Sequence, residues 1–335
     1  MSRTIFQMEE KISCHKYRIG VISILSDMSL EIVKRILGKK DLLAGLRPLP
    51  QAALERVRSE LSLEWTYNSN AIEGNTLSLK ETKMVVELGI TVSGKNLREH
   101  FEVNNHQKAI EYVESLATSM APLTENEILG IHKIVLENIE AEYAGRYRSG
   151  QVRILGANFI PPNHLKIKDL IHELLTATNK NVEKLNVVEL VAKFHHRFVW
   201  IHPFFDGNGR TARLLMNLLF MRDGFPPAVI LYNNRKQYYR ALNMANGGDY
   251  VPFILLVAQA LERSLDLFLE SSGAFGDDEY VPLSELAKKY PYSQEYLSLL
   301  ARQGKIDAHK KARNWLATRA SIDEYIELHV RKGVK

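Results

Sequence analysis

The chain has 335 residues, so it can bury a substantial core and form more than one domain. Its content of 45% hydrophobic and 25% charged residues is that of an ordinary soluble protein. The single cysteine, Cys14, excludes an intramolecular disulfide and favours a reducing compartment, which makes the cytoplasm the expected location. Residues 19–30 are too short and too polar to span a membrane, and nothing resembles a signal peptide.

The N-terminal and central parts of the chain are predicted to be helical. Residues 1–50 read as a helical lead-in that ends with the sequence LRPLP. From residue 51 to residue 270, apolar residues recur mostly at helical spacing, which predicts a mainly α fold. The first helical run of this region passes through Leu54, Val57, Leu61 and Trp65, and Gly74 can cap its end.

One segment interrupts the helical pattern. Between residues 145 and 162, apolar and polar residues alternate beside a turn at residues 155–158, which predicts a short β-hairpin. A hairpin edge beside a catalytic loop can hold a segment of another protein by β-augmentation, with Ile154, Phe159 and Ile160 as candidate docking residues. The alternative is an ordinary structural hairpin.

Residues 202–213, with the sequence HPFFDGNGRTAR, are the most informative stretch. Apolar residues recur at helical spacing before it, from Val187 to Ile201, and after it, from Leu214 to Leu219. The stretch therefore joins two helices, and residues 207–210 present free backbone N–H groups at a helix N-terminus, which is an anion site. Its residue types suit a reaction at a nucleotide phosphate.

Two residues of this loop carry the chemistry. His202 is the only group here that can take a proton near neutral pH. Asp206 offers hard oxygen ligands to Mg²⁺, with the phosphates of the nucleotide completing the shell.

The neighbouring residues suit the binding of phosphates. Gly207 and Gly209 have no Cβ, so the backbone can approach the phosphates closely. Asn208 can donate a hydrogen bond to a phosphate oxygen. Arg210 and Arg213 are three residues apart, so they lie on one face of the following helix and can each bind phosphate through two hydrogen bonds.

Two other interpretations of the loop compete. The spacing of Gly207, Gly209 and Ala212 fits a dinucleotide-binding fingerprint, but that fingerprint must follow a strand and here a helical pattern precedes it. A zinc cluster could be formed by the histidines and the aspartate of this region, His195, His196, His202 and Asp206. Adjacent histidines on a helix point in different directions, which argues against it.

The C-terminal part differs in character. Residues 271–279 are polar and contain glycine, which indicates a linker. Residues 280–335 hold 11 Lys and Arg against 6 Asp and Glu, which accounts for the +5 net charge of the chain. A helix near residue 285, a helix from Ser293 to Gly304, a basic hairpin over 305–316 and a final helix around Ile322 resemble a winged helix of the excisionase-like type. Such a module binds DNA phosphates or recognises a protein partner, and both readings stay open.

Residues 202–213 also resemble the signature of the Fic family, H-P-F-x-[D/E]-G-N-G-R-x-x-R, and meet every fixed position. The resemblance implies a helical core with a β-hairpin flap, and transfer of AMP from ATP to a Ser, Thr or Tyr hydroxyl of a protein. It makes His202 the base and Asp206 the Mg²⁺ ligand. It assigns the binding of the ATP phosphates to residues of the loop and of the next helix: Gly207, Asn208, Gly209, Arg210 and Arg213.

Three further stretches extend the resemblance, which covers roughly residues 51–270. The sequence between residues 145 and 162 resembles the flap of the family. The motif Tyr238-Tyr239-x-x-Leu242-x-x-x-Asn246 resembles the segment that encloses adenine, and helical spacing puts these residues on one face. Aromatic, aliphatic and amide groups suit a purine, although an aromatic stripe without the upstream loop would indicate plain core.

Residues 69–74, SNAIEG, resemble the inhibitory motif of the family, [S/T]-x-x-x-E-[G/N], which begins here with Ser69. The resemblance implies that Glu73 pairs with Arg213 and disturbs the γ-phosphate site, as in the class with an N-terminal inhibitory helix. A negative charge at this place opposes a triphosphate. The other reading of Glu73 is a surface glutamate near a helix end.

The sequence therefore predicts a protein adenylyltransferase that is restrained by Glu73, with domains at residues 1–50, 51–270 and 280–335. Alternatives are removal of AMP by a water that Glu73 orients, transfer of another nucleotide such as UMP, and a DNA-binding regulator whose core only senses nucleotide. Retention of His202 argues for chemistry, because sensing needs no base. Family analogy adds a homodimer, with the segment around Leu97 as the candidate surface.

Overall fold

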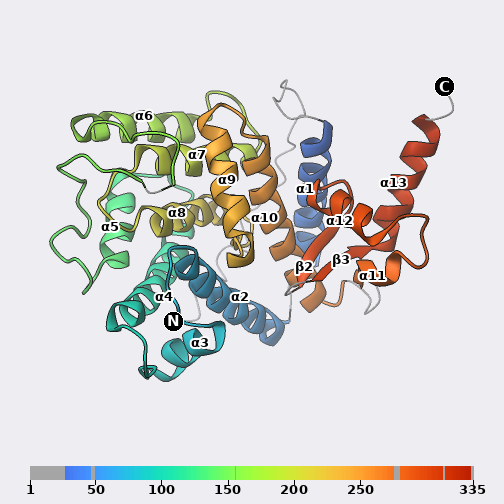
Figure 1. Cartoon of the computed structure of the whole chain (residues 1–335), viewed down its shortest axis with the longest axis horizontal. Helices are drawn as coiled ribbons and strands as arrows, with labels where there is room; N and C mark the ends of the chain where they lie inside the picture. Colours follow the sequence, from blue (N-terminus) through green and yellow to red (C-terminus); the bar gives the residue numbers. More distant parts are fainter. Residues whose placement is uncertain (1–26, 47–49, 155, 275–279, 312–313, 333–335) are drawn as a thin grey trace. The chain divides into compact units, whose positions relative to one another are not determined.

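The computed structural model describes residues 27–46, 50–154, 156–274, 280–311 and 314–332. Cys14, the predicted linker residues 275–279 and Leu155 of the predicted turn lie outside the described residues. The described residues are mostly helical and contain one small sheet, so the predicted mainly α class is confirmed (Figure 1). No described helix combines the length and the apolar content that a membrane crossing requires.

The elements follow one another along the chain in this order. The α-helices before the signature loop are α1 (Asp27–Gly45), α2 (Gln51–Ile72), α3 (Leu79–Leu88), α4 (Leu97–Ala117), α5 (Glu125–Val135), α6 (Ile167–Lys180) and α7 (Val187–Ile201). Those after it are α8 (Asn208–Arg222), α9 (Arg235–Asn246), α10 (Val251–Ser271), α11 (Leu283–Leu286), α12 (Gln294–Arg302) and α13 (Arg319–Lys332). Among the described residues, the short 3-10 helices are η2 (His164–Lys166) and η3 (Tyr232–Asn234), and the strands are β1 (Tyr280–Pro282), β2 (Ala308–Lys311) and β3 (Asn314–Thr318).

The described chain forms two compact units. One comprises Glu60–Phe253, and the other comprises the described residues before Glu60 together with those from Ile254 onward. Helices α2 and α10 therefore contribute residues to both units. The predicted domain boundaries at residues 50, 270 and 280 stay predictions.

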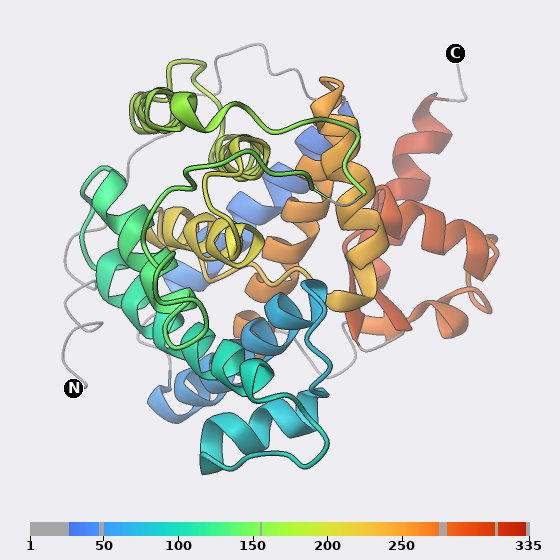
Figure 2. The same ribbon diagram turned by 60° about the vertical axis from the view of Figure 1, so that its left-hand side comes forward.

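Helix α8 is the centre of the first unit. Most of its residues are buried, and it packs against α4, α5 and α7 (Figure 2). The buried amide of Asn217 is satisfied because it accepts a hydrogen bond from the Ala228 amide, at 2.7 Å, and donates one to the Ala228 carbonyl, at 3.2 Å. A close-packed helix of this kind cannot shift without losing contacts on every side, so its N-terminal loop is held in one place.

The helices on each side of the signature loop are confirmed as α7 and α8. Asn186 caps α7 by accepting a hydrogen bond from the Glu189 amide, at 3.0 Å. Helix α7 ends at Ile201 because the next residue precedes Pro203, and a residue before proline is disfavoured in the helical region. The strand that a dinucleotide-binding fold needs before its glycines is replaced by this helix, so that alternative is excluded.

The predicted β-hairpin is wrong for the described residues between 145 and 162, which form a loop without strands. Part of the predicted turn is present, since the Ala157 amide donates to the Ile154 carbonyl at 3.2 Å. Pro161 and Pro162 carry no N–H group and cannot donate to a ladder. The side chain of Gln151 donates to the Pro161 carbonyl instead, at 2.8 Å, so a side-chain contact replaces strand pairing.

The described C-terminal segment contains the predicted elements and one more. Strands β2 and β3 form the expected antiparallel hairpin, and Ser293 caps α12 by accepting from the Tyr296 amide at 3.2 Å. Strand β1, which the sequence did not predict, pairs with β3 and gives the sheet order β1-β3-β2. Three residues are too few for a strand period to be recognised. The winged-helix assignment of this segment stays a prediction.

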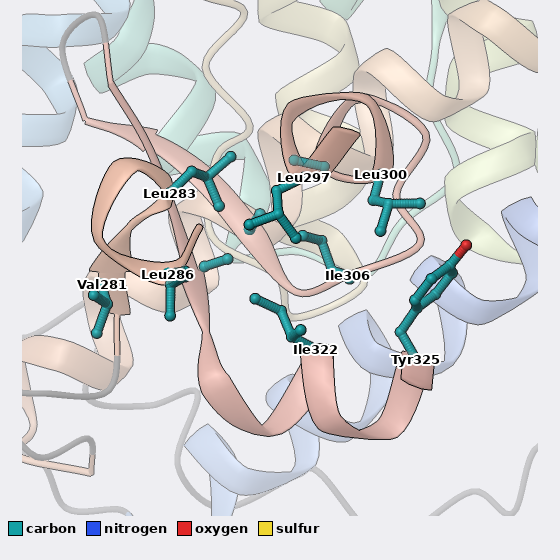
Figure 3. Close-up of a cluster of buried hydrophobic side chains, with 11 residues drawn as sticks. Val281, Leu283, Leu286, Leu297, Leu300, Ile306, Ile322 and Tyr325 are labelled. Atoms are coloured by element: carbon teal, nitrogen blue, oxygen red, sulfur yellow. The ribbon is translucent and has the colours of Figure 1, made fainter. Parts of the chain in front are cut away.

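A small hydrophobic core holds the C-terminal segment together (Figure 3). It is formed by buried side chains from β1, α11, α12, the hairpin and α13: Val281, Leu283, Leu286, Leu297, Leu300, Ala301, Ile306, Ala308, Ala317, Ile322 and Tyr325. The residues predicted to line the helices of this segment, such as Leu297 and Ile322, are thus core residues.

The second unit also contains a buried ion cluster. The Lys39 Nζ of α1 lies 2.6 Å from Asp266 Oδ1 and 2.7 Å from Asp307 Oδ1, and Glu262 binds both Lys39 and Arg35. Three carboxylates thus face two cations in a buried place. Burial and the charge of Glu262 outweigh the attraction of Lys39 and raise the pKa of Asp307 to about 6.

Replacing Asp307 by Asn is expected to remove a pH dependence of stability. The folded chain keeps the Asp307 proton up to about pH 6, whereas an unfolded aspartate releases it near pH 4. Because the folded state binds the extra proton in this window, the free energy of unfolding falls as the pH rises through it. The free energy of unfolding is measured in urea for the wild type and for the Asn variant. Relative to the variant, that of the wild type should fall by up to about 3 kcal/mol between about pH 4 and pH 7. A stability difference that does not change with pH would contradict this.

Candidate active site

The signature loop, residues 202–207, has two residues in the left-handed backbone region. His202 has φ 50° and ψ 60°, and its amide donates to the Phe198 carbonyl at 3.0 Å, which closes the last turn of α7. A residue with a Cβ is rarely found in this region, so its surroundings must hold it there. Gly207 has φ 74°, and a Cβ at this position would lie 3.3 Å from the His132 ring.

Arg148 fixes the signature loop through hydrogen bonds to its backbone carbonyls. Its side chain is buried, and its Nε donates to the His202 carbonyl at 2.8 Å while its backbone amide donates to the Pro203 carbonyl at 2.9 Å. Its two terminal nitrogens donate to the carbonyls of Gly150, at 2.7 Å, and Pro162, at 2.6 Å. One guanidinium group thus connects the signature loop to both ends of the segment predicted as the flap.

The imidazole of His202 is suited to act as a base. Burial and the nearby charge of Arg148 lower the pKa of His202 to about 4, although the Val199 carbonyl, Glu73 and Asp206 favour its charged form. Its Nδ1 is buried and lacks a hydrogen bond of good geometry. The ring is therefore neutral near neutral pH and can accept a proton.

His132, on α5, supports the loop and was not predicted from the sequence. Its ring stacks on Phe204, with centroids 3.5 Å apart and planes at 3°. Its Nδ1 accepts from the Gly145 amide at 3.0 Å, so its Nε2 carries the proton and donates to the Asp206 carbonyl, also at 3.0 Å. Burial lowers the pKa of His132 to about 4, which agrees with this neutral tautomer. Nothing distinguishes His132 in the sequence from an ordinary buried helix residue.

The N-terminus of α8 offers free amides to an anion. The first backbone bond of the helix runs from the Thr211 amide to the Gly207 carbonyl, at 2.9 Å, so the amides of residues 208–210 precede the helical ladder. The Asn208 side chain is buried and committed to Phe204, with Oδ1 accepting from its amide and Nδ2 donating to its carbonyl, both at 2.9 Å. Asn208 can therefore offer its backbone N–H to a phosphate rather than the predicted side chain.

The ion pair between Glu73 and Arg213 that the resemblance implied is present. Arg213 Nη2 lies 2.8 Å from Glu73 Oε1, and the buried guanidinium also donates to the hydroxyl of Ser69, at 3.0 Å, and to its carbonyl, at 2.8 Å. Burial alone would lower the pKa of Arg213, but the charge of Glu73 raises it. A Cβ at Gly209 would collide with Glu73 Oε1, so the carboxylate lies directly against the N-terminal backbone of α8.

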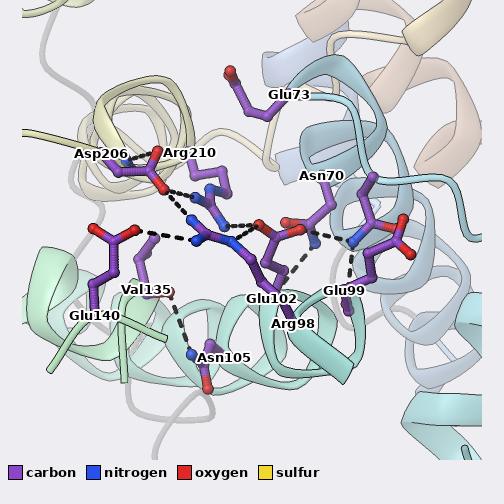
Figure 4. A network of polar contacts seen from close by, with 12 residues as sticks. Asn70, Glu73, Arg98, Glu99, Glu102, Asn105, Val135, Glu140, Asp206 and Arg210 are labelled. Atoms are coloured by element: carbon purple, nitrogen blue, oxygen red, sulfur yellow. Dashed lines mark hydrogen bonds and ion pairs between the residues drawn. The ribbon is translucent and has the colours of Figure 1, made fainter. Parts of the chain in front are cut away.

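A second network surrounds Asp206 and Arg210 (Figure 4). Asp206 Oδ2 lies 2.6 Å from Arg98 Nη2 and 3.3 Å from Arg210 Nη2. Arg210 also contacts Glu102 at 3.3 Å, and Arg98 contacts Glu140 at 3.1 Å. Burial would raise the pKa of Asp206, but Arg210, a backbone amide and Arg98 outweigh it, so the carboxyl is ionised. Neither Arg98 nor the two glutamates belongs to a motif that can be recognised in the sequence.

The face of α9 is only partly available to a ligand. Tyr238 is buried, and its hydroxyl bonds to His195 Nε2 at 2.9 Å and accepts from Arg213 at 3.5 Å. Its hydroxyl is therefore engaged with His195 and Arg213. Leu242 is also buried.

The other two predicted adenine residues are partly exposed. The Tyr239 hydroxyl donates to the Ile72 carbonyl at 3.3 Å, which attaches α9 to the end of α2. Asn246 Oδ1 bonds to His196 Nε2 at 2.9 Å, and its Nδ2 donates to Asn158 Oδ1, also at 2.9 Å. Asn246 thus links α7 to the predicted flap segment.

The three docking residues of that segment differ in exposure. Ile160 is 68% exposed, whereas Phe159 stacks on Trp200 with ring centroids 6.1 Å apart and Ile154 is half-buried. Among these three residues, Ile160 is therefore the exposed apolar side chain.

The zinc alternative finds no support in the described residues, where no group of three His, Cys, Asp or Glu side chains could hold a metal ion. His195 and His196 each have a separate partner, Tyr238 and Asn246, and belong to the packing of α7 against α9.

Known proteins are similar to this chain in sequence and in fold. Residues 122–220 match the profile of the Fic/DOC family. Protein adenylyltransferase Fic from Nematostella vectensis is 39% identical over 254 residues, which cover 74% of this chain and 58% of that protein. The chain spans about half the length of the curated relatives it matches.

Two solved structures are similar over most of the chain. A fragment of Fic-1 from C. elegans is 32% identical with a TM-score of 0.68, covering 74% of this chain and 73% of that one. A Fic domain containing signaling protein from Bacteroides thetaiotaomicron is 29% identical, also with a TM-score of 0.68, covering 74% of this chain and 99% of that one. With the complete signature loop between α7 and α8, these likenesses show that the chain belongs to the Fic/DOC family.

Proposed function

We propose that this chain transfers AMP from ATP to a Ser, Thr or Tyr hydroxyl of a target protein or of itself, and that Glu73 restrains it. The observation that carries the proposal is the carboxylate of Glu73, which pairs with Arg213 and lies against the N-terminal backbone of α8. A carboxylate there occupies an anion site, and a phosphate is the anion that free amides and guanidinium groups suit. The name of the relatives, protein adenylyltransferase Fic, supports the same choice.

The proposed reaction assigns one task to each group. His202 takes the proton of the acceptor hydroxyl as its oxygen bonds to the α-phosphorus. The bond from the α-phosphorus to the oxygen that bridges to the β-phosphate breaks, and pyrophosphate leaves with its electron pair. The amides of residues 208–210 and the guanidinium groups of Arg210 and Arg213 neutralise charge on the phosphates. His202 holds the proton after transfer and returns it to solvent.

Asp206 fits the Mg²⁺ that such a reaction uses. It is ionised, its side chain is 39% exposed, and carboxylate oxygens are the ligands that Mg²⁺ prefers. When bound, the ion would neutralise phosphate charge and help the pyrophosphate to leave. Of the residues predicted to contact adenine, we propose that Tyr239 and Asn246 do so. We propose that Tyr238 instead holds the Arg213 guanidinium in place.

Removal of AMP from a modified protein is the second candidate. The Glu73 side chain is 33% exposed beside the proposed phosphate site, so water can reach its carboxylate. A carboxylate in this position can take a proton from a water that attacks the α-phosphorus.

The remaining parts of the proposal concern partners and location. We propose that residues 280–335 recognise DNA or a partner protein, and that a homodimer forms through the region of Leu97, whose side chain is 58% exposed. Alternatives with another transferred nucleotide, such as UMP, use the same groups. The single cysteine supports a reducing compartment, and we place the reaction in the cytoplasm.

Mass spectrometry of the full chain carrying Glu73→Gly tests the proposed reaction. The protein is incubated with Mg²⁺ and, separately, with ATP, GTP, CTP or UTP. We expect the mass of AMP to be added to a hydroxyl residue with ATP alone, because the glycine removes the group that blocks the anion site. A larger addition with UTP would replace AMP by UMP, and no addition with any nucleotide, on the chain or on proteins of a lysate, would contradict transfer.

A further inference from the structure

The carboxylate proposed to hold Mg²⁺ is already bound to a cation of the protein. Asp206 Oδ2 accepts a hydrogen bond from Arg98 Nη2 at 2.6 Å, and Asp206 Oδ1 accepts one from the Gly207 amide, also at 2.6 Å (Figure 4). Arg98 belongs to the first turn of α4, where Asn96 caps the helix by accepting from the Arg98 amide at 2.9 Å. A metal ion at Oδ2 and the Arg98 guanidinium would occupy the same side of the carboxylate.

Two arginines contact Oδ2, and the structure indicates which of them can leave. The Arg210 side chain is only 3% exposed and is also held by Glu102 at 3.3 Å. The Arg98 side chain is 44% exposed, so it can move into solvent without opening a cavity. Arg98 is therefore the group that a metal ion would displace.

Arg98 has other carboxylates to receive it. Its Nη1 lies 3.1 Å from Glu140 Oε1, and its Nε lies 3.5 Å from Glu102 Oε1. Asp206, Glu140 and Glu102 together carry three negative charges against the two positive charges of Arg98 and Arg210. This surplus of negative charge favours a further cation, and Arg98 can keep Glu140 when it releases Asp206.

We propose that Arg98 is a positioning residue that holds the Asp206 carboxylate in place and must withdraw onto Glu140 before a divalent cation binds there. The inference rests on the proposed function, because that function assigns the metal to Asp206. It adds a second restraint, which acts at the metal ligand and is separate from the contact of Glu73 with Arg213. Both restraints come from residues that precede the signature loop in the chain: Glu73 directly follows α2, and Arg98 lies in α4.

Binding of Mn²⁺, followed by electron paramagnetic resonance of the free ion with ADP present, tests the proposal without measuring transfer. The full chain with Glu73→Gly serves as the parent. Arg98→Ala should bind Mn²⁺ more tightly by about two- to fivefold, as expected for loss of a partly exposed ion pair. Glu140→Gln should weaken Mn²⁺ binding by a similar factor, because Arg98 then loses its ion pair with Glu140 and stays bound to Asp206.

A change of charge alone would produce the same signs, so two controls are needed. Lys95→Ala removes a positive charge near the start of α4 without a contact to Asp206; its Nζ donates to the Thr76 carbonyl. It should change Mn²⁺ binding much less than Arg98→Ala. In the Arg98→Ala background, Glu140→Gln should have almost no effect, because Glu140 acts through Arg98. Equal effects of Lys95→Ala and Arg98→Ala, or an undiminished effect of Glu140→Gln without Arg98, would overturn the proposal.

Asp206→Asn separates this proposal from the one on which it rests. If Asp206→Asn loses Mn²⁺ binding while Arg98→Ala binds as the parent does, the gating role of Arg98 is wrong and the metal assignment stands. If Asp206→Asn binds Mn²⁺ normally, both the metal assignment and the role of Arg98 are wrong. Addition of AMP in the mass spectrometry experiment is independent of either outcome.

Discussion

Replacing Glu73 by Gly is expected to raise self-labelling from α-labelled ATP by about tenfold or more, equivalent to about 1.4 kcal/mol or more in productive binding. The change removes the carboxylate that lies against the backbone at Gly209 and releases the guanidinium of Arg213 from its 2.8 Å contact. Both changes make the anion site available to a triphosphate. Glu73 follows the last residue of α2, so glycine here does not weaken the interior of a helix.

Glu73→Gln is the matched variant for this prediction. It keeps the size of the side chain and its position against Gly209 but removes the charge, so its labelling should lie between that of the wild type and that of Glu73→Gly. ATP affinity, measured by calorimetry, should follow the same order. Wild-type labelling and wild-type ATP affinity in both variants would exclude the inhibitory role of Glu73.

Replacing His202 by Ala in the Glu73→Gly protein should lower transfer by about a hundredfold to ten-thousandfold, the usual range for loss of a general base. The reason is that burial and Arg148 keep the His202 imidazole neutral at physiological pH, with a pKa of about 4, so it can take the hydroxyl proton. Affinity for ATP should change little, because the amides of residues 208–210 and the two arginines, which are proposed to bind the phosphates, are untouched.

His172 offers a control for this substitution, since it is an exposed histidine on α6. His172→Ala should leave both labelling and ATP affinity at the parental level. Incorporation of label from α-labelled ATP, measured beside calorimetric ATP binding, separates the two effects. Labelling by the His202→Ala protein at the parental rate would exclude this imidazole as the base.

The success and failure of the sequence-based predictions follow from the range of the interactions involved. The helices around the loop were predicted correctly because apolar spacing is a local pattern that acts within a few residues. The predicted hairpin failed because strand formation depends on backbone partners, and here side chains hold the two ends of the loop instead. The contacts of Tyr238 with His195 and Arg213 were not predicted for a similar reason, since they depend on helix packing.

The sequence by itself determined the class of fold and the chemical groups of the loop, because residue identity sets pKa range, charge and backbone freedom. It also carried the pairing of Glu73 with Arg213, through resemblance to a family. Only the tertiary structure decided three contacts: the ion pair of Arg98 with Asp206, the hydrogen bond of Arg148 to the His202 carbonyl, and the stacking of His132 on Phe204. These contacts join residues that are far apart in the chain, and no local pattern encodes them, because they arise only when separate helices and loops pack around α7 and α8.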